Sequence, residues 1–237
     1  VDWELGGVAE RGGSGRTWPG VAGGGVYFQG GGTIRSCLVQ SNESAFLGGG
    51  VTLGVGGTVE ACTIVRNTAR TCGGGLYGSA TGTVRDTILY FNSSPNAPNW
   101  YHDDNSSLDP LFPSISSEHC CAIPQPPGIG CTAADPDFVN AANGDCRLLP
   151  SSPCINAGVN LAWMAGSQDV AGNERIIDGV VDIGAHEYDT NGFACSFRAD
   201  RRQGVSPLAV TLTACVTGSA SALNFYGRDP AGDGATH

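Results

Sequence analysis

The residues best suited to chemistry lie in one short stretch that combines amide, aromatic and acidic side chains: Asn99, Trp100, Tyr101, His102, Asp103 and Asp104. An aromatic ring can stack on the face of a sugar, and a neighbouring carboxylate can accept hydrogen bonds from its hydroxyl groups. The stretch therefore predicts a carbohydrate-binding site, with an extracellular glycan or matrix as the partner. The alternative is a solvated loop in which the Trp and Tyr rings cover one end of the core.

A second group of acidic residues lies in turn-rich sequence further along the chain: Asp169, Asp178, Asp182 and Glu187. Carboxylates in tight turns commonly accept hydrogen bonds from backbone N–H groups, and we expect that role here. Calcium is the alternative, because it prefers carboxylate and carbonyl oxygen ligands. The Cys and His residues lack the spacing of a zinc site. We therefore expect no metal site and no cofactor, with calcium as the open alternative.

Catalysis on a glycosidic bond needs two carboxylates that face each other across that bond. The repeated part of the chain, described next, offers Glu43, Glu60 and Asp86, and they do not form a column of carboxylates on one face. The sequence therefore predicts no catalytic residue.

The elements that must position these residues come from a pattern that occurs three times. Glycine triplets begin at Gly23, Gly48 and Gly73, so the repeat is 25 residues long. Other landmarks keep the same spacing: Thr33, Thr58 and Thr83, then Val39, Ile64 and Leu89, then Asn42, Asn67 and Asn92. A repeat of this length, rich in Gly, Thr, Val and Ile, is typical of a β-solenoid. We expect an all-β chain that forms a right-handed parallel β-helix.

Stacked coils place equivalent residues in columns, and each column has an expected role. The apolar columns should point inward: Ile34, Val59 and Val84, then Val39, Ile64 and Leu89. Arg35, Glu60 and Arg85 should point outward as an alternating charge ladder. Gly25, Gly50 and Gly75 belong to a corner that needs positive φ or close backbone approach. Asn42, Asn67 and Asn92 should form a second corner in the left-handed region, with amides bonded from coil to coil.

The chain has 10 cysteines, mostly in loop-rich sequence, which favours disulfides and an oxidising compartment. Cys37 and Cys62 are equivalent residues of neighbouring coils and either bridge or stack as buried thiols. For the others we expect Cys195–Cys215, Cys146–Cys154 and one pair among Cys120, Cys121 and Cys131.

The charge balance restricts the classes of partner. The formal net charge is −10, and all 12 basic residues are Arg. An acidic chain with scattered Arg does not suit nucleic acid, and no apolar run is long enough for membrane insertion. We expect a secreted or cell-surface protein, present here as a piece of a longer one.

Two longer motifs point to a known family. Residues 134–158 read ADPDFVNAANGDCRLLPSSPCINAG and residues 169–188 read DVAGNERIIDGVVDIGAHEY. With the Gly-Gly-Gly coils, this resembles secreted bacterial right-handed parallel β-helix proteins of the pectate-lyase-like superfamily that carry a choice-of-anchor Q type C-terminal module. His186 stands where that family usually has Tyr. The resemblance implies that a lyase would use an Arg or Lys base. Because Arg35 and Arg85 flank Glu60, a structural ladder is favoured instead.

We expect three parts: coils over 1–132 with an irregular loop at 93–132, where the register breaks after Asn92, a C-terminal β-helix or anchor-like module over 133–190, and a partial β-sandwich over 191–237. The last part looks like the start of a PKD-like domain. The leading hypothesis is a non-enzymatic structural or adhesive protein. The alternatives are a polysaccharide-binding or polysaccharide-degrading β-helix protein, and a filament subunit that self-associates through solenoid ends or the incomplete sandwich.

Overall fold

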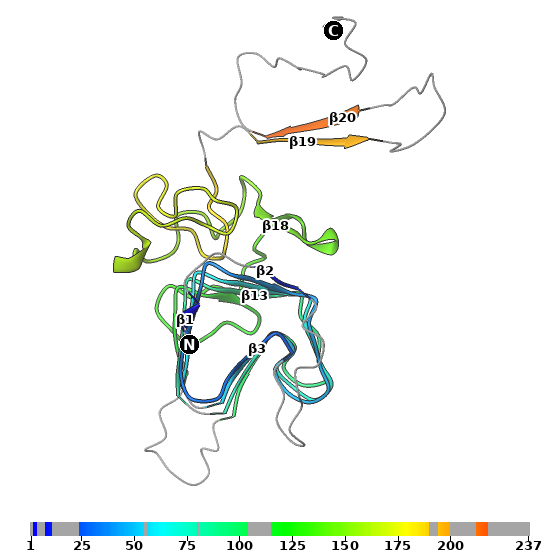
Figure 1. Cartoon of the computed structure of the whole chain (residues 1–237), viewed down its shortest axis with the longest axis vertical. Helices are drawn as coiled ribbons and strands as arrows, with labels where there is room; N and C mark the ends of the chain where they lie inside the picture. Colours follow the sequence, from blue (N-terminus) through cyan, green and yellow to red (C-terminus); the bar gives the residue numbers. More distant parts are fainter. Residues whose placement is uncertain are drawn as a thin grey trace, which may run out of the picture. The chain divides into compact units, whose positions relative to one another are not determined.

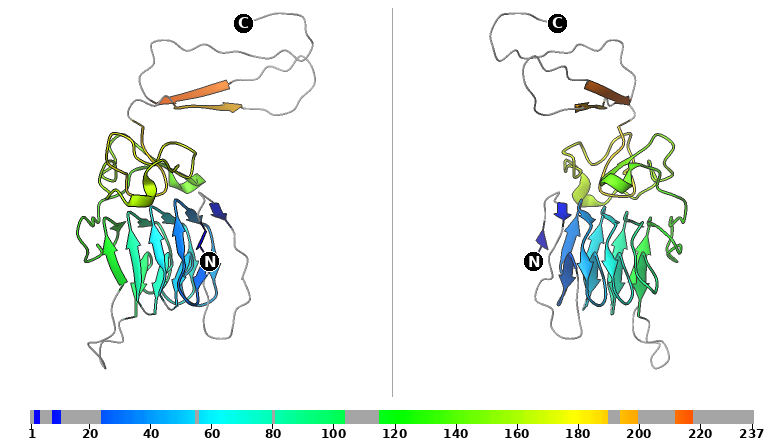
Figure 2. Two further views of the ribbon diagram at one scale, coloured as in Figure 1. Left: turned by 60° about the vertical axis from the view of Figure 1, so that its left-hand side comes forward. Right: turned by 90° about the vertical axis from the view of Figure 1, so that its right-hand side faces the viewer.

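The computed structural model describes residues 2–3, 8–10, 24–54, 56–79, 81–103, 115–189, 194–199 and 212–217. The chain forms two compact units, Val1–Tyr188 and Asp189–His237. The first unit contains a β-solenoid of about three turns, in which successive turns are about 25 residues apart. Figure 1 looks along the solenoid, so its coils overlap, and Figure 2 shows the coils stacked side by side. The expected all-β solenoid is confirmed.

Three parallel sheets form the sides of the solenoid, and each coil contributes one short strand to each sheet. The first sheet has the order β1 (Asp2–Trp3), β4 (Thr33–Arg35), β8 (Thr58–Glu60), β12 (Gly82–Arg85) and β15 (Ile115–Glu118). The second has the order β2 (Val8–Glu10), β5 (Leu38–Gln40), β9 (Thr63–Val65), β13 (Ile88–Tyr90) and β16 (Cys121–Ala122). The third has the order β3 (Val26–Phe28), β7 (Val51–Leu53), β11 (Leu76–Gly78) and β14 (Trp100–His102). A small fourth pair joins β6 (Glu43–Ser44) to β10 (Thr68–Ala69).

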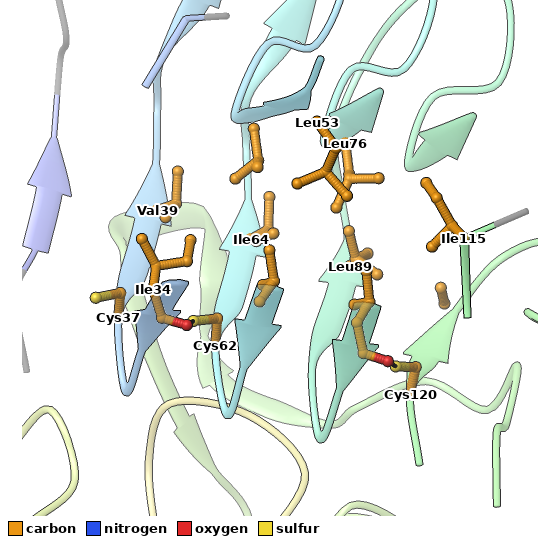
Figure 3. Packing of buried hydrophobic residues seen from close by; sticks show 14 of the residues in the cluster. Ile34, Cys37, Val39, Leu53, Cys62, Ile64, Leu76, Leu89, Ile115 and Cys120 are labelled. Atoms are coloured by element: carbon orange, nitrogen blue, oxygen red, sulfur yellow. Dashed lines mark hydrogen bonds between the residues drawn. The ribbon is translucent and has the colours of Figure 1, made fainter. Parts of the chain in front are cut away.

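The pairing register places equivalent residues directly over each other. Val26 pairs with Val51 and Val51 pairs with Leu76, so these three residues form one file. The expected inward columns are buried in a single apolar core, in which Val39, Ile64 and Leu89 are at most 3% exposed. Figure 3 shows these three side chains following one another from coil to coil. Inter-coil pairing thus converts a linear repeat into a continuous core.

The solenoid continues beyond Asn92 with an irregular coil that no longer keeps the 25-residue spacing. β14, β15 and β16 pair with β11, β12 and β13, as strands of a further coil would. Trp100 pairs with Leu76, and the sequence separation of these two residues is close to the 25-residue repeat. Cys121 pairs with Ile88, and their sequence separation is longer than the repeat. Extra residues between β14 and β15 lengthen this coil, and that insertion hides the repeat in the sequence. On the other side, β1 and β2 pair with β4 and β5, as a preceding coil would.

The asparagine column forms a buried hydrogen-bond ladder. The side-chain amide of Asn42 donates to Oδ1 of Asn67 at 3.0 Å, and that of Asn67 donates to Oδ1 of Asn92 at 3.0 Å. Each acceptor oxygen also accepts the backbone N–H of the Asn one coil earlier. Asn67 additionally donates to the carbonyl of Val39 at 2.9 Å. Because Asn67 is fully buried, these bonds satisfy polar groups that water cannot reach.

The Asn corner differs from the expectation in which residue takes the left-handed conformation, whereas the glycine corner shows both expected features, positive φ and close backbone approach. At the Asn corner the preceding residues take it: Ser41, Arg66 and Phe91 have φ of 57°, 57° and 54°. At the glycine corner the first glycines do so, with φ of 58° at Gly48 and 64° at Gly73. Gly50 instead serves close approach, because a Cβ there would lie 2.7 Å from the carbonyl oxygen of Gly75. At the Asn corner, the residue before each Asn makes the turn, and the Asn side chain forms the hydrogen bonds of the ladder.

The expected charge ladder is present along the first sheet. Nε of Arg35 lies 2.9 Å from Glu60, and Arg85 lies 3.6 Å from Glu60 and 3.2 Å from Glu118. Glu60 is only 5% exposed, although this column lies outside the coil. In the same column, the guanidinium of Arg35 lies over the ring of Trp163, 5.0 Å from its centroid.

The segment after the coils does not add further turns but folds back over the side of the solenoid. It contains β17 (Phe138–Asn140), η1 (Ala141–Asn143), the antiparallel partner β18 (Asp145–Leu148) and η2 (Ala162–Met164). Its Ala185 N–H donates to the Thr63 hydroxyl of β9 at 2.8 Å, and Gly184 N–H donates to the carbonyl of Asp86 at 2.8 Å. Figure 1 shows this green and yellow segment above the sheet that contains β13. We call this segment, residues 133–188, the lateral cover.

In the described residues of the second unit, β19 (Ala194–Ala199) and β20 (Leu212–Thr217) form an antiparallel pair. Cys195 pairs with Val216 and Cys215 pairs with Ser196, so the two cysteines are not register partners. The expected Cys195–Cys215 disulfide depends on side chains outside the described ones and stays a prediction.

We expect Asn67→Ala to lower the free energy of unfolding by about 2–4 kcal/mol, because it leaves several buried donors and acceptors without partners. The measurement is urea unfolding followed by circular dichroism. The control is Asn143→Ala, which removes an exposed Asn and should change stability by less than about 0.5 kcal/mol. Equal effects of the two substitutions would contradict the ladder.

A methyl group at Gly50 should be poorly tolerated. It would lie 2.7 Å from the Gly75 oxygen and 2.8 Å from the Asn67 amide nitrogen, so we expect Gly50→Ala to destabilise by about 1–3 kcal/mol. Gly30 has open space around it, so Gly30→Ala is the control and should be neutral or slightly stabilising. Thermal unfolding of both variants decides the question, and a neutral Gly50→Ala would show that neighbouring coils can separate at this corner.

Candidate functional site

Strand β14 carries the aromatic residues of the predicted sugar-binding stretch on the last paired strand of the third sheet. Trp100, Tyr101 and His102 pair with Leu76, Tyr77 and Gly78 of β11. The stretch is therefore largely a strand with fixed side-chain directions rather than the loop that the sequence suggested. Asp104 lies outside the described residues.

Asn99 has a different environment from the rest of the stretch. Its Oδ1 accepts the backbone N–H of Asn92 at 3.0 Å, and its amide donates to the carbonyl of Ile123 at 2.9 Å. Asn99 is thus the next member of the asparagine ladder and is 9% exposed. Asn99 is therefore not available to a ligand, and only the residues after Asn99 in this stretch can form a ligand-binding surface.

A column of three tyrosines and one threonine runs across the third sheet. Tyr27, Thr52, Tyr77 and Tyr101 occupy the same register position on β3, β7, β11 and β14. The rings of Tyr77 and Tyr101 are stacked, with centroids 5.9 Å apart and an interplanar angle of 13°. Tyr27 is 44% exposed and Tyr101 is 36% exposed, whereas Tyr77 is buried between its neighbours. We call these four residues the tyrosine column.

Asp103 joins a carboxylate to the tyrosine column. The hydroxyl of Tyr77 donates to Oδ2 of Asp103 at 3.0 Å, and the backbone N–H of Asp103 donates to the carbonyl of Gly78 at 2.8 Å. Burial raises the pKa of Tyr77, and the hydrogen bond to Asp103 raises it further. Tyr77 therefore remains protonated at physiological pH and keeps the exposed Asp103 in place.

The neighbouring side chains of the stretch are fixed by the coil. The indole Nε1 of Trp100 donates to the carbonyl of Pro124 at 2.7 Å, and its ring packs against the solenoid core. His102 lies opposite Gly78 and is half-buried. The arrangement thus offers exposed tyrosine rings next to one carboxylate, which suits stacking on a sugar ring and hydrogen bonding to its hydroxyls.

Three of the four acidic residues singled out in the lateral cover, Asp169, Asp182 and Glu187, accept hydrogen bonds from backbone groups, as the sequence suggested. Asp169 accepts the N–H groups of Ala171 and Asn173 at 2.8 Å each. Asp182 accepts the N–H of Asn156 at 2.7 Å, and Glu187 accepts the N–H of Asp182 at 3.1 Å. Within the described ranges, no three His, Cys, Asp or Glu side chains are grouped so that they could hold a metal ion.

A buried ion pair in the lateral cover was not anticipated from the sequence. Arg175 is fully buried and lies 3.3 Å from Glu187. Its guanidinium also donates to the carbonyl oxygens of Asp182 and Gly184. A buried Arg that binds several carbonyls fixes the fold of an irregular segment that has almost no regular secondary structure. The sequence signal was weak, since Arg175 stands in an ordinary turn motif.

Asp86 has a structural role that the sequence analysis did not identify. It is fully buried at a left-handed corner with φ of 47° and accepts the N–H of Val159 at 2.8 Å. Burial raises the pKa of Asp86 from 3.8 to about 6, against the lowering effect of the Val159 N–H, His119 and Arg175. Asp86 thus connects a coil corner to the lateral cover through a carboxyl that favours its neutral form.

A shallow groove of about 480 Å³ lies elsewhere, between the Asn corner and the lateral cover. Two neighbouring coils supply Arg66 and the half-exposed Phe91, and the cover supplies Asp135, Asp137 and Phe138. Arg66 and Phe91 both have the left-handed conformation of the Asn corner. The groove is separate from the tyrosine column and shares none of its residues.

The eight cysteines with described side chains are all thiols in the structure, so the expected disulfide among Cys120, Cys121 and Cys131 is not formed. Cys37 and Cys62 stack, as one of the two expectations held, and each donates to the carbonyl two residues before it, at 3.0 and 3.2 Å. The expected Cys146–Cys154 bond is not formed. Cys154 instead contacts the thiol of Cys121 closely enough for a hydrogen bond.

Comparisons with protein-family models, with curated proteins and with solved structures find no match to this chain. Among the described residues, no helix has the length and apolar character needed to cross a membrane.

The raised pKa of Asp86 predicts a pH-dependent stability. The folded state keeps a proton that the unfolded chain loses near pH 4, so the contribution of Asp86 is complete below that pH and is lost as pH rises through 6. We expect the free energy of unfolding to fall by about 2 kcal/mol over this interval through this group. Urea unfolding between pH 4 and 7 measures it.

Asp86→Asn should remove that pH-dependent loss, because Asn cannot ionise and tolerates the left-handed conformation. The control is Glu174→Gln, which removes an exposed carboxylate of the lateral cover. If the Asp86→Asn and Glu174→Gln proteins show the same pH slope, Asp86 is not the titrating group.

Proposed function

We propose that this chain is a non-enzymatic extracellular protein with a structural or adhesive role. The supporting observation is that the charged and asparagine side chains of the coils bond to the neighbouring coils. Glu60 is 5% exposed and paired with Arg35 and Arg85, and the asparagines are buried in their ladder. A catalytic acid or base must reach the substrate and be free to exchange a proton. Groups committed to inter-coil bonds do not meet that requirement.

The proposal includes the finer relationships suggested by the sequence motifs. These are membership of the pectate-lyase-like superfamily, a choice-of-anchor Q type module at residues 133–190 and a PKD-like module at residues 191–237. The parallel solenoid and the antiparallel pair β19–β20 are compatible with them. Secretion or display at the cell surface belongs to the same proposal and is supported by the number of cysteines and by the acidic composition.

The second candidate function is polysaccharide binding through the tyrosine column. Tyr27 and Tyr101 expose about two fifths of their surface at the two ends of this column. Asp103 stands beside Tyr101, held by the Tyr77 hydroxyl. A repeating glycan suits a surface on which aromatic groups recur along a line, because several sugar rings can bind at once. Adhesion to a glycan matrix would combine both proposals.

Incubation of the purified chain with pectin, alginate and other acidic glycans tests the first proposal. We expect no unsaturated product and no new reducing ends above the level of a heat-denatured sample. Turnover at ordinary enzyme rates, of about 1 per second or faster, would overturn it.

A glycan array tests the second proposal. We expect Tyr101→Ala to weaken binding at least about tenfold, because loss of one aromatic stacking contact costs on the order of 1.4 kcal/mol. Phe46→Ala is the matched control, since Phe46 is 49% exposed on a different part of the coil. Tyr101 is a better probe than Trp100, which also packs on the core. Binding that survives Tyr101→Ala, or is lost equally with Phe46→Ala, excludes this surface.

A further inference from the structure

Two adjacent cysteines at the end of the last coil point to opposite sides of the chain. Cys120 belongs to the core inside the solenoid, whereas Cys121 belongs to the apolar cluster beneath the lateral cover. Both are fully buried. Successive residues of an extended chain face opposite ways, so the two thiols cannot share a partner. Each of them has a different cysteine beside it.

Cys131 is the neighbour of Cys120. The backbone N–H of Cys120 donates to Sγ of Cys131 at 3.4 Å, and the two thiols are also close enough to share a hydrogen bond. Cys131 is half-buried, so it is reachable from solvent, unlike Cys120. The hydrogen bond from Cys120 lowers the pKa of Cys131 to about 6. An accessible thiol that ionises readily is the kind that attacks a disulfide.

Cys154 is the neighbour of Cys121. The two thiols share a hydrogen bond, and the Cys121 thiol also donates to the carbonyl of Ala134 at 3.2 Å. Cys121 belongs to β16 of the solenoid, and Cys154 lies in a turn of the lateral cover. The carbonyl oxygen of Cys154 accepts a hydrogen bond from the N–H of Ile183. This contact therefore crosses the interface between the coils and the cover.

The other close pair, Cys37 and Cys62, is not arranged for bonding. These residues occupy equivalent positions in adjacent parallel coils, so their Cα–Cβ bonds run side by side about 4.8 Å apart. A disulfide needs Cβ atoms that approach to about 3.8 Å, which parallel neighbours do not reach without backbone movement. Figure 3 shows both thiols at matching places in their coils. Cys131 and Cys154 come from outside the coil stack and are free of that constraint.

We propose that Cys120–Cys131 and Cys121–Cys154 are the two disulfide-forming sites of the first unit, oxidised by a low-molecular-mass disulfide such as oxidised glutathione. At the first site the Cys131 thiolate attacks the small disulfide and releases one small thiol. At the second site Cys121 and Cys154 are both buried, so one of these thiols attacks the small disulfide, with the same release of a small thiol, only while the lateral cover is locally open. The partner thiolate then attacks the mixed disulfide, forms the protein S–S bond and releases the second small thiol. Two protein thiols lose two protons and two electrons, and one small disulfide becomes two thiols.

The two bonds would have different effects on the molecule. Cys120–Cys131 closes a short loop at the end of the last coil. Cys121–Cys154 joins the lateral cover covalently to the solenoid and closes a much longer segment, so it removes more freedom from the unfolded chain. The cover has little regular secondary structure of its own, so a covalent link at its base would restrict its local unfolding.

Peptide mapping of the full chain after oxidation by glutathione, without reduction, tests the pairing. Because Cys120 and Cys121 share one peptide, double variants separate the two possibilities. Cys120→Ser/Cys131→Ser should keep the link to the Cys154 peptide, and Cys121→Ser/Cys154→Ser should keep the link to the Cys131 peptide. The crossed variant Cys120→Ser/Cys154→Ser should leave Cys121 and Cys131 open to alkylation.

The unmodified chain provides a second readout that does not depend on whether the variants fold. After oxidation, dithiothreitol should lower its Tm by roughly 5–10 °C. A link between Cys146 and Cys154, a bond between Cys121 and Cys131 in the crossed variant, or full alkylation after oxidation would each overturn the proposal.

Discussion

The structure depends on a single constraint: each coil must lie over the next with like residues in contact. The short strands contain two to four residues each, so none would be stable alone. Backbone pairing to the neighbouring coil, the asparagine ladder and the charge ladder all act along the same direction. The result is a core in which Val39, Ile64 and Leu89 meet their own equivalents. A change at one coil is therefore felt by the coils above and below it.

The lateral cover changes the properties of the solenoid side on which it lies. Leu38, Val65 and Ile88 point away from the coil interior, yet they are buried because residues of the cover pack against them. The cover brings carboxylates and Arg175 into the same interface, where they bind backbone groups of an irregular chain. Asp86 belongs to both parts, since it lies on a coil corner and accepts an N–H from the cover. At this surface, the backbone conformation of the coil corner and the burial of charged groups therefore depend on each other.

The regular coils could be predicted from the sequence because glycine triplets, asparagines and inward apolar residues recur at a fixed spacing. The fourth coil could not, because the additional residues between β14 and β15 shift its later strands out of the repeat. The segment after the coils was expected as a module over 133–190, but its packing against the side of the solenoid was missed for another reason. Leu38-Val39, Ile64-Val65 and Ile88-Leu89 are apolar on both faces of their strands, which is a signal of burial on both sides that alternation arguments overlook.

The candidate site was only partly accessible to sequence reasoning. The stretch from Asn99 to Asp103 was identified, but the separation of Asn99 from the aromatic residues depends on a bond to Asn92 across a shortened corner. The tyrosine column was not identified, since Thr52 interrupts it and the pairing of Tyr77 with Tyr101 needs the register of β11 and β14. The contacts Cys121–Cys154 and Asp86–Val159 join segments far apart in the chain, which no local pattern can reveal.

One column shows how much chemical variety the coil tolerates at a fixed geometry. Cys37, Cys62, Thr87 and Cys120 occupy matching places, and each donates from its side chain to the carbonyl two residues earlier, at 3.0, 3.2, 2.7 and 3.3 Å. A hydroxyl and a thiol are interchangeable for that purpose. The coil geometry therefore requires one short donor at this position and accepts either oxygen or sulfur as the donor atom, so the four coils can differ in their content of oxidisable thiol without a change in backbone shape.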